Sequence, residues 1–389
     1  MRLSAVLNSS LDVSGASGWT QPVTPPQKLS FASRQSTYRN SHQILRQFGY
    51  ERELQPTNLE NRCFVFFGAP PEGWHVDHAL FSSGQAAMAA TLHLVETLPV
   101  LFSRKPLRLA HIGAYYETGE CLRLFPSISH TSGSEVRPAD IVLIEPVFFK
   151  RAFHEVDVMQ LRSKFESASP VLIFDDTLTG AALDPSGDLQ ALSNLDPLAV
   201  LRVASGLKLL QGGLELANVG IVSLYTRDAD EELASRIRKI RSVLGLGLRL
   251  SELAALEAPW FLNRDYADSY RRAVFEHNAA LAQAVAGASN IFSSVSHPSL
   301  DCRRGVAPFC VFRLRDESAD AYERLAAKLA DISKRRQILF ERGGSFGFRG
   351  HRFDVVNPEK EPPFLRVAMG RRDGWSCEEI MKMFKAIAS

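Results

Sequence analysis

The sequence lacks the features that would tie this chain to a membrane or to nucleic acid. Its 45 basic and 43 acidic residues leave a formal charge of only +2 over 389 residues. Such a balance provides no strong field that would recruit nucleic acid or an anionic lipid surface. The best candidate for a membrane span, residues 244–262, is interrupted by Arg249, Glu252 and Glu257. We therefore expect no nucleic-acid partner and no membrane partner.

Cysteines are few and are not paired along the sequence. There are five, they are odd in number, and none is spaced as Cys-x-x-Cys. Neither a disulfide framework nor a zinc cage is expected from this pattern, and a reducing cytoplasm is the natural compartment. The N-terminus also lacks the apolar core of a signal peptide. The prediction is a cytoplasmic protein without a metal site.

What the sequence does contain is an alternation of apolar strands with helical stretches. Residues 1–60 are polar and predict an N-terminal arm with at most a short helix around 41–48. From Phe64 onward the alternation is typical of a sheet covered by helices on both faces. The clearest strand candidates are 107–115, 141–145, 171–174, 200–204 and 219–224. Long helices from residue 228 onward then lead into a smaller α+β region, so we place the large domain at 61–265 and the small one at 266–389.

Three short segments carry the chemistry. Ser83-Gly84-Gln85 opens an alanine-rich helix, and small residues at a helix start suit the binding of a phosphate. The same pattern also serves as a simple helix cap. Asp175 ends an apolar strand, where α/β proteins place ligands, and a buried carboxylate there needs a cationic partner. A turn or a cap would account for Asp176.

Lys208 is the most informative of the candidate residues. It follows a predicted strand and is enclosed by apolar residues and glycines, in the segment Ser205-Gly206-Leu207-Lys208-Leu209-Leu210-Gln211-Gly212-Gly213. Such surroundings disfavour the ammonium form, and a neutral amine can form a Schiff base. An ordinary solvated lysine is the alternative.

In this order, the three segments resemble the fold-type I enzymes that use pyridoxal 5'-phosphate (PLP). Their closest likeness is to the Cys/Met-metabolism branch, which includes cystathionine synthases and lyases and methionine γ-lyase. That branch shows Ser-Gly-Met-Ala-Ala where this chain has Ser83-Gly84-Gln85-Ala86-Ala87. Its Leu-Tyr-Gly-Gly-Thr is similar to the segment Ala114-Tyr115-Tyr116-Glu117-Thr118. Its Asp-Asn-Thr-Phe and Ser-x-Thr-Lys are similar to residues 175–178 and 205–208.

The resemblance implies a fold and a set of roles. It implies an α/β fold whose large domain holds a mostly parallel seven-stranded sheet, with a smaller α+β C-terminal domain. Ser83, Gly84, Gln85, Thr177 and Ser205 would bind the cofactor, together with Tyr115 stacked on its ring, Asp175 at its nitrogen and Lys208 in the Schiff base. Tyr116 is the reserve for the stacking role. The catalytic residues would be Lys208, Asp175 and Tyr115.

Three further residues are predicted to bind the substrate. Arg366 lies in Phe364-Leu365-Arg366-Val367-Ala368-Met369-Gly370, which looks like the family's Arg-Leu-Ser-Val-Gly strand, so it would grip the α-carboxylate. Tyr38, followed by Arg39, echoes a Tyr-x-Arg that reaches the neighbouring subunit. Arg349 lies in a glycine-rich loop, 343–350, that could recognise a polar substrate side chain or form a solvated turn. The sequence departs from the family at Leu207, Asp176 and the Tyr38-Arg39 pair.

The function implied is an enzyme acting on an L-amino acid through an external aldimine and α-proton abstraction. Elimination or replacement at Cβ or Cγ is the first expectation, and an aminotransferase or a specialised biosynthetic cyclase is the alternative. A non-catalytic aminotransferase-like regulatory domain is a further one, although it would have no physical reason to keep Lys208, Asp175 and Arg366 together. The family likeness also implies a homodimer with a shared active site. The histidines His75 and His78, in a segment that suggests a loop, give only a weak indication of a metal.

Overall fold

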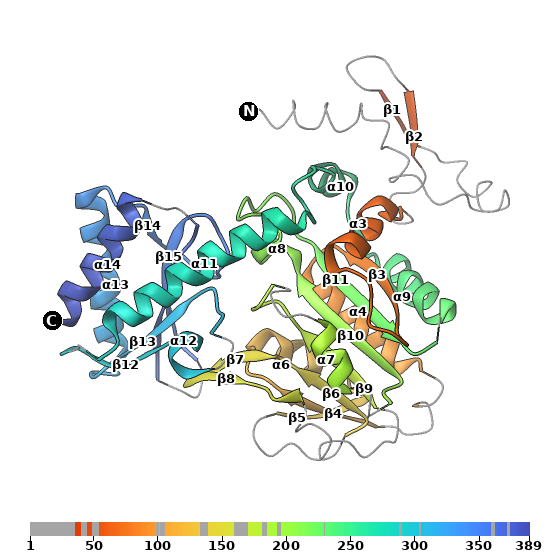
Figure 1. Ribbon diagram of the computed structural model, residues 1–389, viewed down its shortest axis with the longest axis horizontal. Coiled ribbons are helices and arrows are strands. Elements are labelled where there is room, and N and C mark those ends of the chain that lie inside the picture. Colours follow the sequence, from red (N-terminus) through yellow and green to blue (C-terminus); the bar gives the residue numbers. More distant parts are fainter. Residues whose placement is uncertain are drawn as a thin grey trace.

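The computed structural model describes most of the chain. The described residues are 54–98, 101, 106–132, 139–158, 170–180, 185–192, 196–228, 230–287, 290–302, 305–358, 362–371 and 374–389, with two further strands at 36–39 and 45–48. They form two large sheets with their covering helices, joined by one long helix, and two small two-stranded sheets (Figure 1).

The larger sheet has seven strands in the order β3-β11-β10-β9-β6-β4-β5. Its strands are β3 (His75–Phe81), β4 (Leu107–Ile112), β5 (Ile128–Ser132), β6 (Ile141–Ile144), β9 (Val171–Asp175), β10 (Ala199–Ser205) and β11 (Gly220–Thr226). Only β11 runs antiparallel to its neighbours. The predicted mostly parallel seven-stranded sheet is therefore confirmed, as are the five strand candidates.

Helices cover both faces of this sheet, which explains why its strands are apolar without alternation. In β6, Ile141 and Leu143 pack in the core formed with α4 (Gly84–Glu96), α6 (Tyr116–Arg123) and α9 (Glu231–Leu244). Val142 and Ile144 point the opposite way, into a second core with α7 (Pro185–Leu192). A third core joins α3 (Thr57–Phe67) and α10 (Leu250–Leu256) to the β3–β11 end of the sheet.

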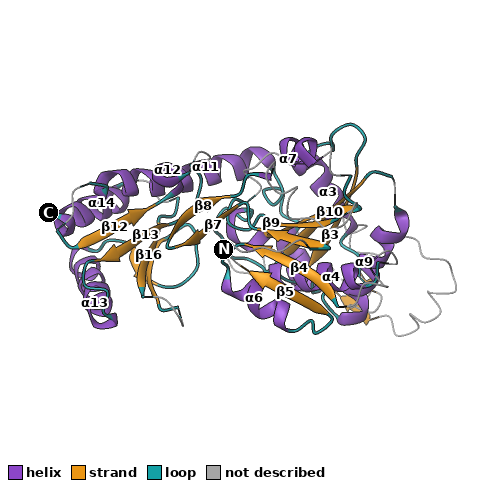
Figure 2. Ribbon diagram, turned by 90° about the horizontal axis from the view of Figure 1, so that it is seen from below, coloured by secondary structure: helices purple, strands orange, loops and turns teal. Residues whose placement is uncertain are grey.

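The smaller sheet has five strands in the order β12-β13-β16-β15-β14. They are β12 (Phe292–Ser296), β13 (Cys310–Leu314), β14 (Phe340–Arg342), β15 (His351–Val356) and β16 (Phe364–Ala368), packed with α13 (Ala319–Arg336) and α14 (Trp375–Ala388). The long helix α11 (Arg264–Val285) runs from the large domain across to this sheet in both ribbon views (Figures 1 and 2). These elements match the expected smaller α+β domain.

A hairpin, β7 (Val147–Lys150) with β8 (Ala152–Glu155), connects the two halves on another side. Its Phe153 packs against Phe309, with ring centroids 5.4 Å apart, and its backbone N–H donates to the Ser296 hydroxyl at 3.3 Å. The two domains therefore share an apolar contact in addition to α11.

The edge strand β3 corrects the interpretation of residues 75–78 as a loop. His75 and His78 lie on β3, three residues apart and so on opposite faces. His78 is buried, with Nδ1 2.9 Å from the Ser223 hydroxyl and its ring stacked on Phe67. The strand could not be predicted from the sequence because its polar side chains are satisfied by partners on distant elements, such as Ser223 and Arg238.

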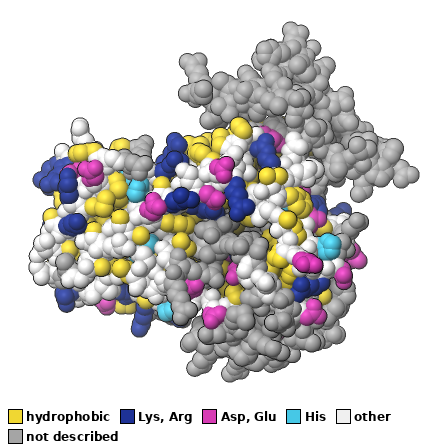
Figure 3. Space-filling model, in the orientation of Figure 1, with side chains coloured by type: hydrophobic (Ala, Val, Ile, Leu, Met, Phe, Trp, Pro, Cys, Tyr) yellow, Lys and Arg dark blue, Asp and Glu magenta, His cyan; other side chains and the backbone are white. Residues whose placement is uncertain are grey.

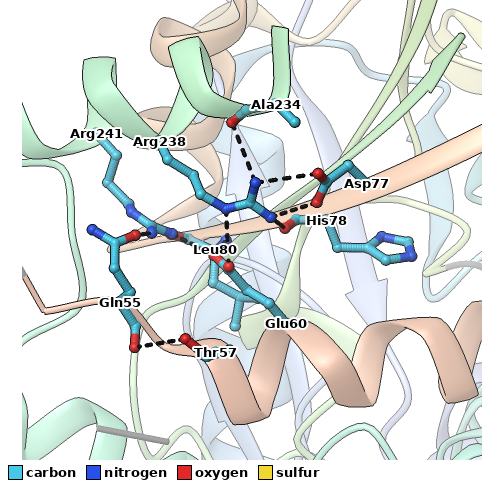
Figure 4. A network of polar contacts seen from close by, with 9 residues as sticks. All are labelled: Gln55, Thr57, Glu60, Asp77, His78, Leu80, Ala234, Arg238 and Arg241. Atoms are coloured by element: carbon cyan, nitrogen blue, oxygen red, sulfur yellow. Dashed lines mark hydrogen bonds and ion pairs between the residues drawn. The ribbon is translucent and has the colours of Figure 1, made fainter. Parts of the chain in front are cut away.

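The free edge of β3 is covered by side chains of α3 and α9 instead of by another strand (Figure 4). The Leu80 N–H donates to the Glu60 carboxylate at 3.1 Å, and Arg241 donates to the Leu80 carbonyl at 2.8 Å. Arg238 donates to the His78 carbonyl at 2.9 Å and pairs with Asp77. These contacts satisfy edge groups that would otherwise be open to another chain.

The N-terminal arm contains two described strands. Here β1 (Ser36–Arg39) pairs antiparallel with β2 (Leu45–Phe48). The short helix expected around 41–48 is thus wrong for 45–48, because the pairing with β1 imposes an extended backbone on a segment with weak local preference. The side chains of Tyr38 and Arg39 lie outside what the structure describes.

The distribution of charged side chains on the surface agrees with the balanced composition. On the face drawn in Figure 3, the described basic and acidic side chains are interspersed. Within the described ranges, no helix is long and apolar enough to cross a membrane. The same ranges contain no cluster of three or more potential metal ligands.

Candidate active site

The predicted site residues converge at the carboxyl ends of the parallel strands, where α/β folds bind ligands. Asp175 ends β9, Ser205 ends β10, and Glu145 directly follows β6. Lys208 lies on α8 (Gly206–Leu209), the short helix that continues from β10. Strand order therefore brings together residues that are far apart in the sequence.

The start of α4 and the end of β10 form one small cradle. Ser83 is the N-cap of α4, and its hydroxyl accepts a hydrogen bond from the Ala86 N–H at 3.0 Å. A Cβ on Gly84 would lie 2.9 Å from the Cβ of Ser205, so only glycine lets these two segments touch. The first N–H groups of a helix have no partner within it and favour an anion. The cradle thus has the donors that a phosphate needs.

Lys208 is partly buried under the loop that follows β14. Its Nζ hydrogen-bonds the Ser345 hydroxyl and lies 5.5 Å and 5.7 Å from the ring centroids of Phe346 and Phe348. Burial lowers the pKa of Lys208; Arg366 lowers it further, and Glu117 opposes the shift. The environment therefore shifts the pKa of Lys208 in the direction that the sequence predicts.

The loop 343–350 is packed in this region, in contrast to a solvated turn. Phe346, Gly347 and Phe348 are buried, and a Cβ on Gly347 would collide with the Lys208 carbonyl. Gly347 has φ +79°, a conformation that side chains rarely adopt. The glycine content of the loop is thus explained by its close approach to the lysine helix.

Asp175 provides an acid at the centre of the site. Its Oδ1 accepts a hydrogen bond from the Thr177 N–H at 3.0 Å. Burial, and next the negative charge of Glu145, raise the pKa of Asp175 to about 6. A cation beside it would relieve both effects. Thr177 itself accepts from the Ser205 N–H at 3.0 Å, so it ties the acid to the cradle.

Asp176, which departs from the family pattern, has a structural explanation. It forms a bidentate pair with Arg202 of β10, at 2.6 Å and 2.9 Å, and Arg202 also donates to Asp188 at 3.1 Å. All three side chains are buried. A buried arginine needs such partners, so the carboxylate at 176 follows from the arginine at 202.

Tyr115 precedes α6 and lies on the same side as the acid. It is 37% exposed, whereas Tyr116 is 70% exposed. Burial raises the pKa of the Tyr115 phenol, and a hydrogen bond that the phenol donates to Glu117 and the charge of Asp175 add to the rise. Its proximity to Asp175 makes Tyr115 the better stacking candidate of the two.

Glu117 is a site residue that sequence reasoning missed. Its carboxylate accepts from the Gln85 amide and from the Tyr116 hydroxyl, each at 3.1 Å. It also provides the largest charge effect on Lys208. The sequence offered one indication of this role, because Glu117 stands where the similar motif Leu-Tyr-Gly-Gly-Thr has a glycine. Tyr116 and Glu117 thus stand where the similar motif has two glycines.

Arg366 of β16 approaches the site from the small domain. Its Nη2 lies 3.4 Å from the Asp354 carboxylate of β15, and its buried Nε has no hydrogen-bond partner. Burial lowers the pKa of Arg366, while Asp354 and the two tyrosines Tyr115 and Tyr116 oppose the shift. The guanidinium is therefore near Tyr115 and has capacity for an additional acceptor.

The other substrate-binding candidates are less well placed. Arg349 is exposed, and its charge acts on Tyr270 of α11. Arg352 lies closer to the lysine loop, with its guanidinium 3.9 Å from the Phe348 ring centroid and paired with Glu215 at 2.9 Å. His351 is buried and accepts the Gly370 N–H at 3.1 Å. A role for Arg349, like that for Tyr38, stays a prediction.

Comparison with known proteins supports the same fold. No family model matches the sequence, and no curated protein matches it. A methionine gamma lyase from Micromonospora echinospora has a similar structure, with a TM-score of 0.63 at 20% identity, over 100% of this chain and 99% of that one. A cystathionine gamma-lyase from yeast gives 0.62 at 16%, over 100% and 98%. A cystathionine gamma synthase from Xanthomonas oryzae pv. oryzae gives 0.62 at 16%, with the same coverage.

The architecture therefore has the fold of the fold-type I PLP enzymes, as the sequence resemblance implied. Within that class, the similar structures named above are gamma lyases and a gamma synthase, so the likeness to the Cys/Met-metabolism branch is confirmed at the level of the fold. At identities of 16–20%, the reaction has to be argued from the side chains.

Those side chains fit PLP. The cradle that a Cβ on Gly84 would fill suits its phosphate, and the acid with a raised pKa suits its ring nitrogen. The amine of Lys208, with its lowered pKa, suits its aldehyde. One feature of the phosphate region differs from the family, because Leu207 offers no hydroxyl there.

Proposed function

We propose that this chain is a PLP-dependent enzyme that removes the α-proton of an L-amino acid and eliminates or replaces a group at Cβ or Cγ. The observation that carries the proposal is the convergence on Lys208. A partly buried amine with a lowered pKa lies within electrostatic reach of Arg366, on a helix that continues from the Ser205 end of β10. Asp175 is tied to that same end through Thr177.

Each residue has a task that follows from its surroundings. The first N–H groups of α4 and the Ser205 hydroxyl would hold the phosphate. Asp175 would hold a proton on the ring nitrogen, because an ionised carboxylate in a buried place is stabilised by a cation. When bound, PLP supplies an electron sink for the electrons left at Cα.

Substrate binding would involve the small domain. Arg366 would bind the α-carboxylate through its free Nε and its terminal nitrogens, a geometry that suits a planar carboxylate. Lys208 would take the α-proton, since its lowered pKa eases the loss of its own proton and the Ser345 hydroxyl orients its Nζ. Tyr115 would cover the ring, and its raised pKa keeps the phenol protonated.

The choice of elimination or replacement over amino transfer is supported by the names of the similar structures, which are gamma lyases and a gamma synthase. The catalytic groups are the same for amino transfer, so the test has to distinguish the products. We further propose a homodimer with the cytoplasm as its compartment, on the family likeness and on the scattered cysteines of the sequence, which lack Cys-x-x-Cys spacing.

The test is a set of measurements on purified protein reconstituted with PLP. Wild type should show the visible absorbance of lysine-bound PLP, and Lys208→Ala should lose it. Lys239→Ala, an exposed lysine of α9, is the matched control and should keep it. Incubation with a panel of amino acids should release a 2-oxo acid and ammonia. Transfer of the amino group to an added oxo acid would establish the aminotransferase instead, and no absorbance in wild type would reject the proposal.

A further inference from the structure

A buried pair behind Tyr115 makes contacts that go beyond the effect of its glutamate on the pKa of Asp175. Glu145, just after β6, and His111, on β4, are both buried, and Nε2 of His111 lies 2.9 Å from Oε1 of Glu145. The same carboxylate accepts the Tyr115 N–H at 3.0 Å and the Ala114 N–H at 3.1 Å. One acidic side chain therefore fixes the turn that carries the tyrosine.

The turn is built around this carboxylate. A Cβ on Gly113 would collide with Glu145 and would lie 2.6 Å from Nε2 of His111, so residue 113 must be glycine for the turn to close over the pair. Because β4 and β6 are adjacent parallel strands, His111 and Glu145 come from neighbouring strand ends. Two strands and the turn thus meet at the Glu145 carboxylate.

The oxygens of Glu145 are already engaged by protein donors. Oε1 accepts from His111 and from Tyr115, and Oε2 accepts from Ala114 and, at 3.3 Å, again from Tyr115. This arrangement leaves the carboxylate poorly suited to bind a ligand directly. Apart from its negative charge, which raises the pKa of Asp175, Glu145 therefore acts on the site through the groups that it holds.

We propose that Glu145, supported by His111, is the positioning residue for Tyr115. Its backbone hydrogen bonds fix the start of α6, so that the Tyr115 ring stands over the place where PLP binds. The inference rests on the proposed function, since it concerns how the chain holds that cofactor. If it is right, the contribution of Glu145 to PLP affinity depends on the presence of the Tyr115 ring.

A double-mutant cycle in PLP affinity tests this dependence, because an effect transmitted through one side chain disappears when that side chain is removed. The affinity of the apoprotein for PLP is measured by fluorescence quenching, together with the visible circular dichroism of the bound cofactor. The variants are Glu145→Gln, Tyr115→Ala and the double variant. Glu120→Gln, an exposed residue of α6, is the control.

Glu145→Gln should weaken PLP binding about tenfold in the wild-type background, comparable to the loss of an aromatic contact. It should also change the circular dichroism band. In the Tyr115→Ala background the same change should alter the affinity by about twofold or less. If Glu145→Gln does not fold, His111→Asn, which is too short to reach the carboxylate, takes its place in the cycle.

Equal losses in both backgrounds would overturn the inference and leave the proposed function intact, because they would show a general structural effect. An unchanged affinity in Glu145→Gln would overturn it as well. If wild type takes up no PLP at all, the proposed function fails and this inference fails with it.

Discussion

At the scale of the residue, the most informative group is Asp175, because two unfavourable effects act on it. Burial and the nearby charge of Glu145 raise its pKa to about 6. The charges on Asp175 from the described residues come from the carboxylates of Glu145 and Asp176, so its ionised form would be stabilised by a nearby cation. A protonated ring nitrogen would provide one, which couples the binding of PLP to the ionisation of Asp175.

We expect Asp175→Asn to weaken PLP binding at pH 7.5, and the difference from wild type to shrink as the pH falls. Below about pH 6 the wild-type carboxyl of the apoprotein becomes protonated and loses its advantage. The affinity ratio between wild type and variant should fall by at most about tenfold per pH unit, since one proton is involved. Titrations at several pH values with both proteins measure the ratio, and a constant ratio would contradict the assignment.

The stability of the apoprotein provides the matching control, because Asp175→Asn should raise the free energy of unfolding while it weakens PLP binding. A carboxyl group whose pKa is raised by folding binds its proton more tightly in the folded state, so the wild type loses stability as the pH rises from about 4 to 6. Asp175→Asn removes that loss. The variant apoprotein should be more stable than wild type at pH 7.5 by roughly 1 to 3 kcal/mol.

Residues of the candidate site could be predicted only where the flanking sequence itself indicates their role. Lys208, Asp175, Ser205 and the Ser83-Gly84 turn follow from their own flanking sequence. Glu117, Glu145 and Ser345 were missed, because a glutamate or a serine acquires its role from partners 30 or more residues away. Long-range pairing of this kind leaves no periodic signal in the sequence.

At the scale of the element, the edge of β3 shows how polar side chains can replace a neighbouring strand. Glu60 receives the Leu80 N–H and pairs with Arg241 at 2.5 Å, in a setting where Arg241 is only 1% exposed. A buried guanidinium without its carboxylate is costly.

Glu60→Ala should therefore destabilise the protein by roughly 3 to 5 kcal/mol, as expected for breaking a buried pair. Glu232→Ala on α9, whose partner Arg236 forms an exposed i,i+4 pair, should cost less than about 1 kcal/mol. Urea unfolding of the two variants and wild type measures the difference. Equal effects would show that the Glu60 network contributes no more than a surface pair.

Strands with two buried faces were the easiest elements to predict from the sequence. Ile141–Ile144 is apolar throughout because each side chain meets a helix layer on one face or the other. In contrast, β3 begins with His75, Val76, Asp77 and His78, a polar run whose partners lie on α9 and β11. The strand at 45–48 was likewise hidden, because only its pairing with β1 defines it.

At the scale of the whole molecule, we propose that a second copy of the chain completes the site. The family likeness implies that Tyr38 reaches the site of a second copy. If so, wild type should have twice the mass of one chain in light scattering. Mixing Lys208→Ala with Tyr38→Ala subunits should restore activity to about a quarter of wild type, since half of the random dimers carry one intact site. A monomer, or no restoration in a mixture of folded dimers, would contradict the shared site.

The long helix α11 has a consequence for how far apart the two halves of the site lie. Arg271 donates to the Gly180 carbonyl of the large domain, and Asn278 pairs with the backbone of Met369 at the end of the Arg366 strand, at 2.9 Å and 3.0 Å. These two anchors are seven helical residues apart, a length of about 10 Å. α11 thus sets the distance between the large domain, which carries Lys208, and the small domain, which carries Arg366. Only a bend at one of its ends, near Leu262 or Ala286, would change that spacing.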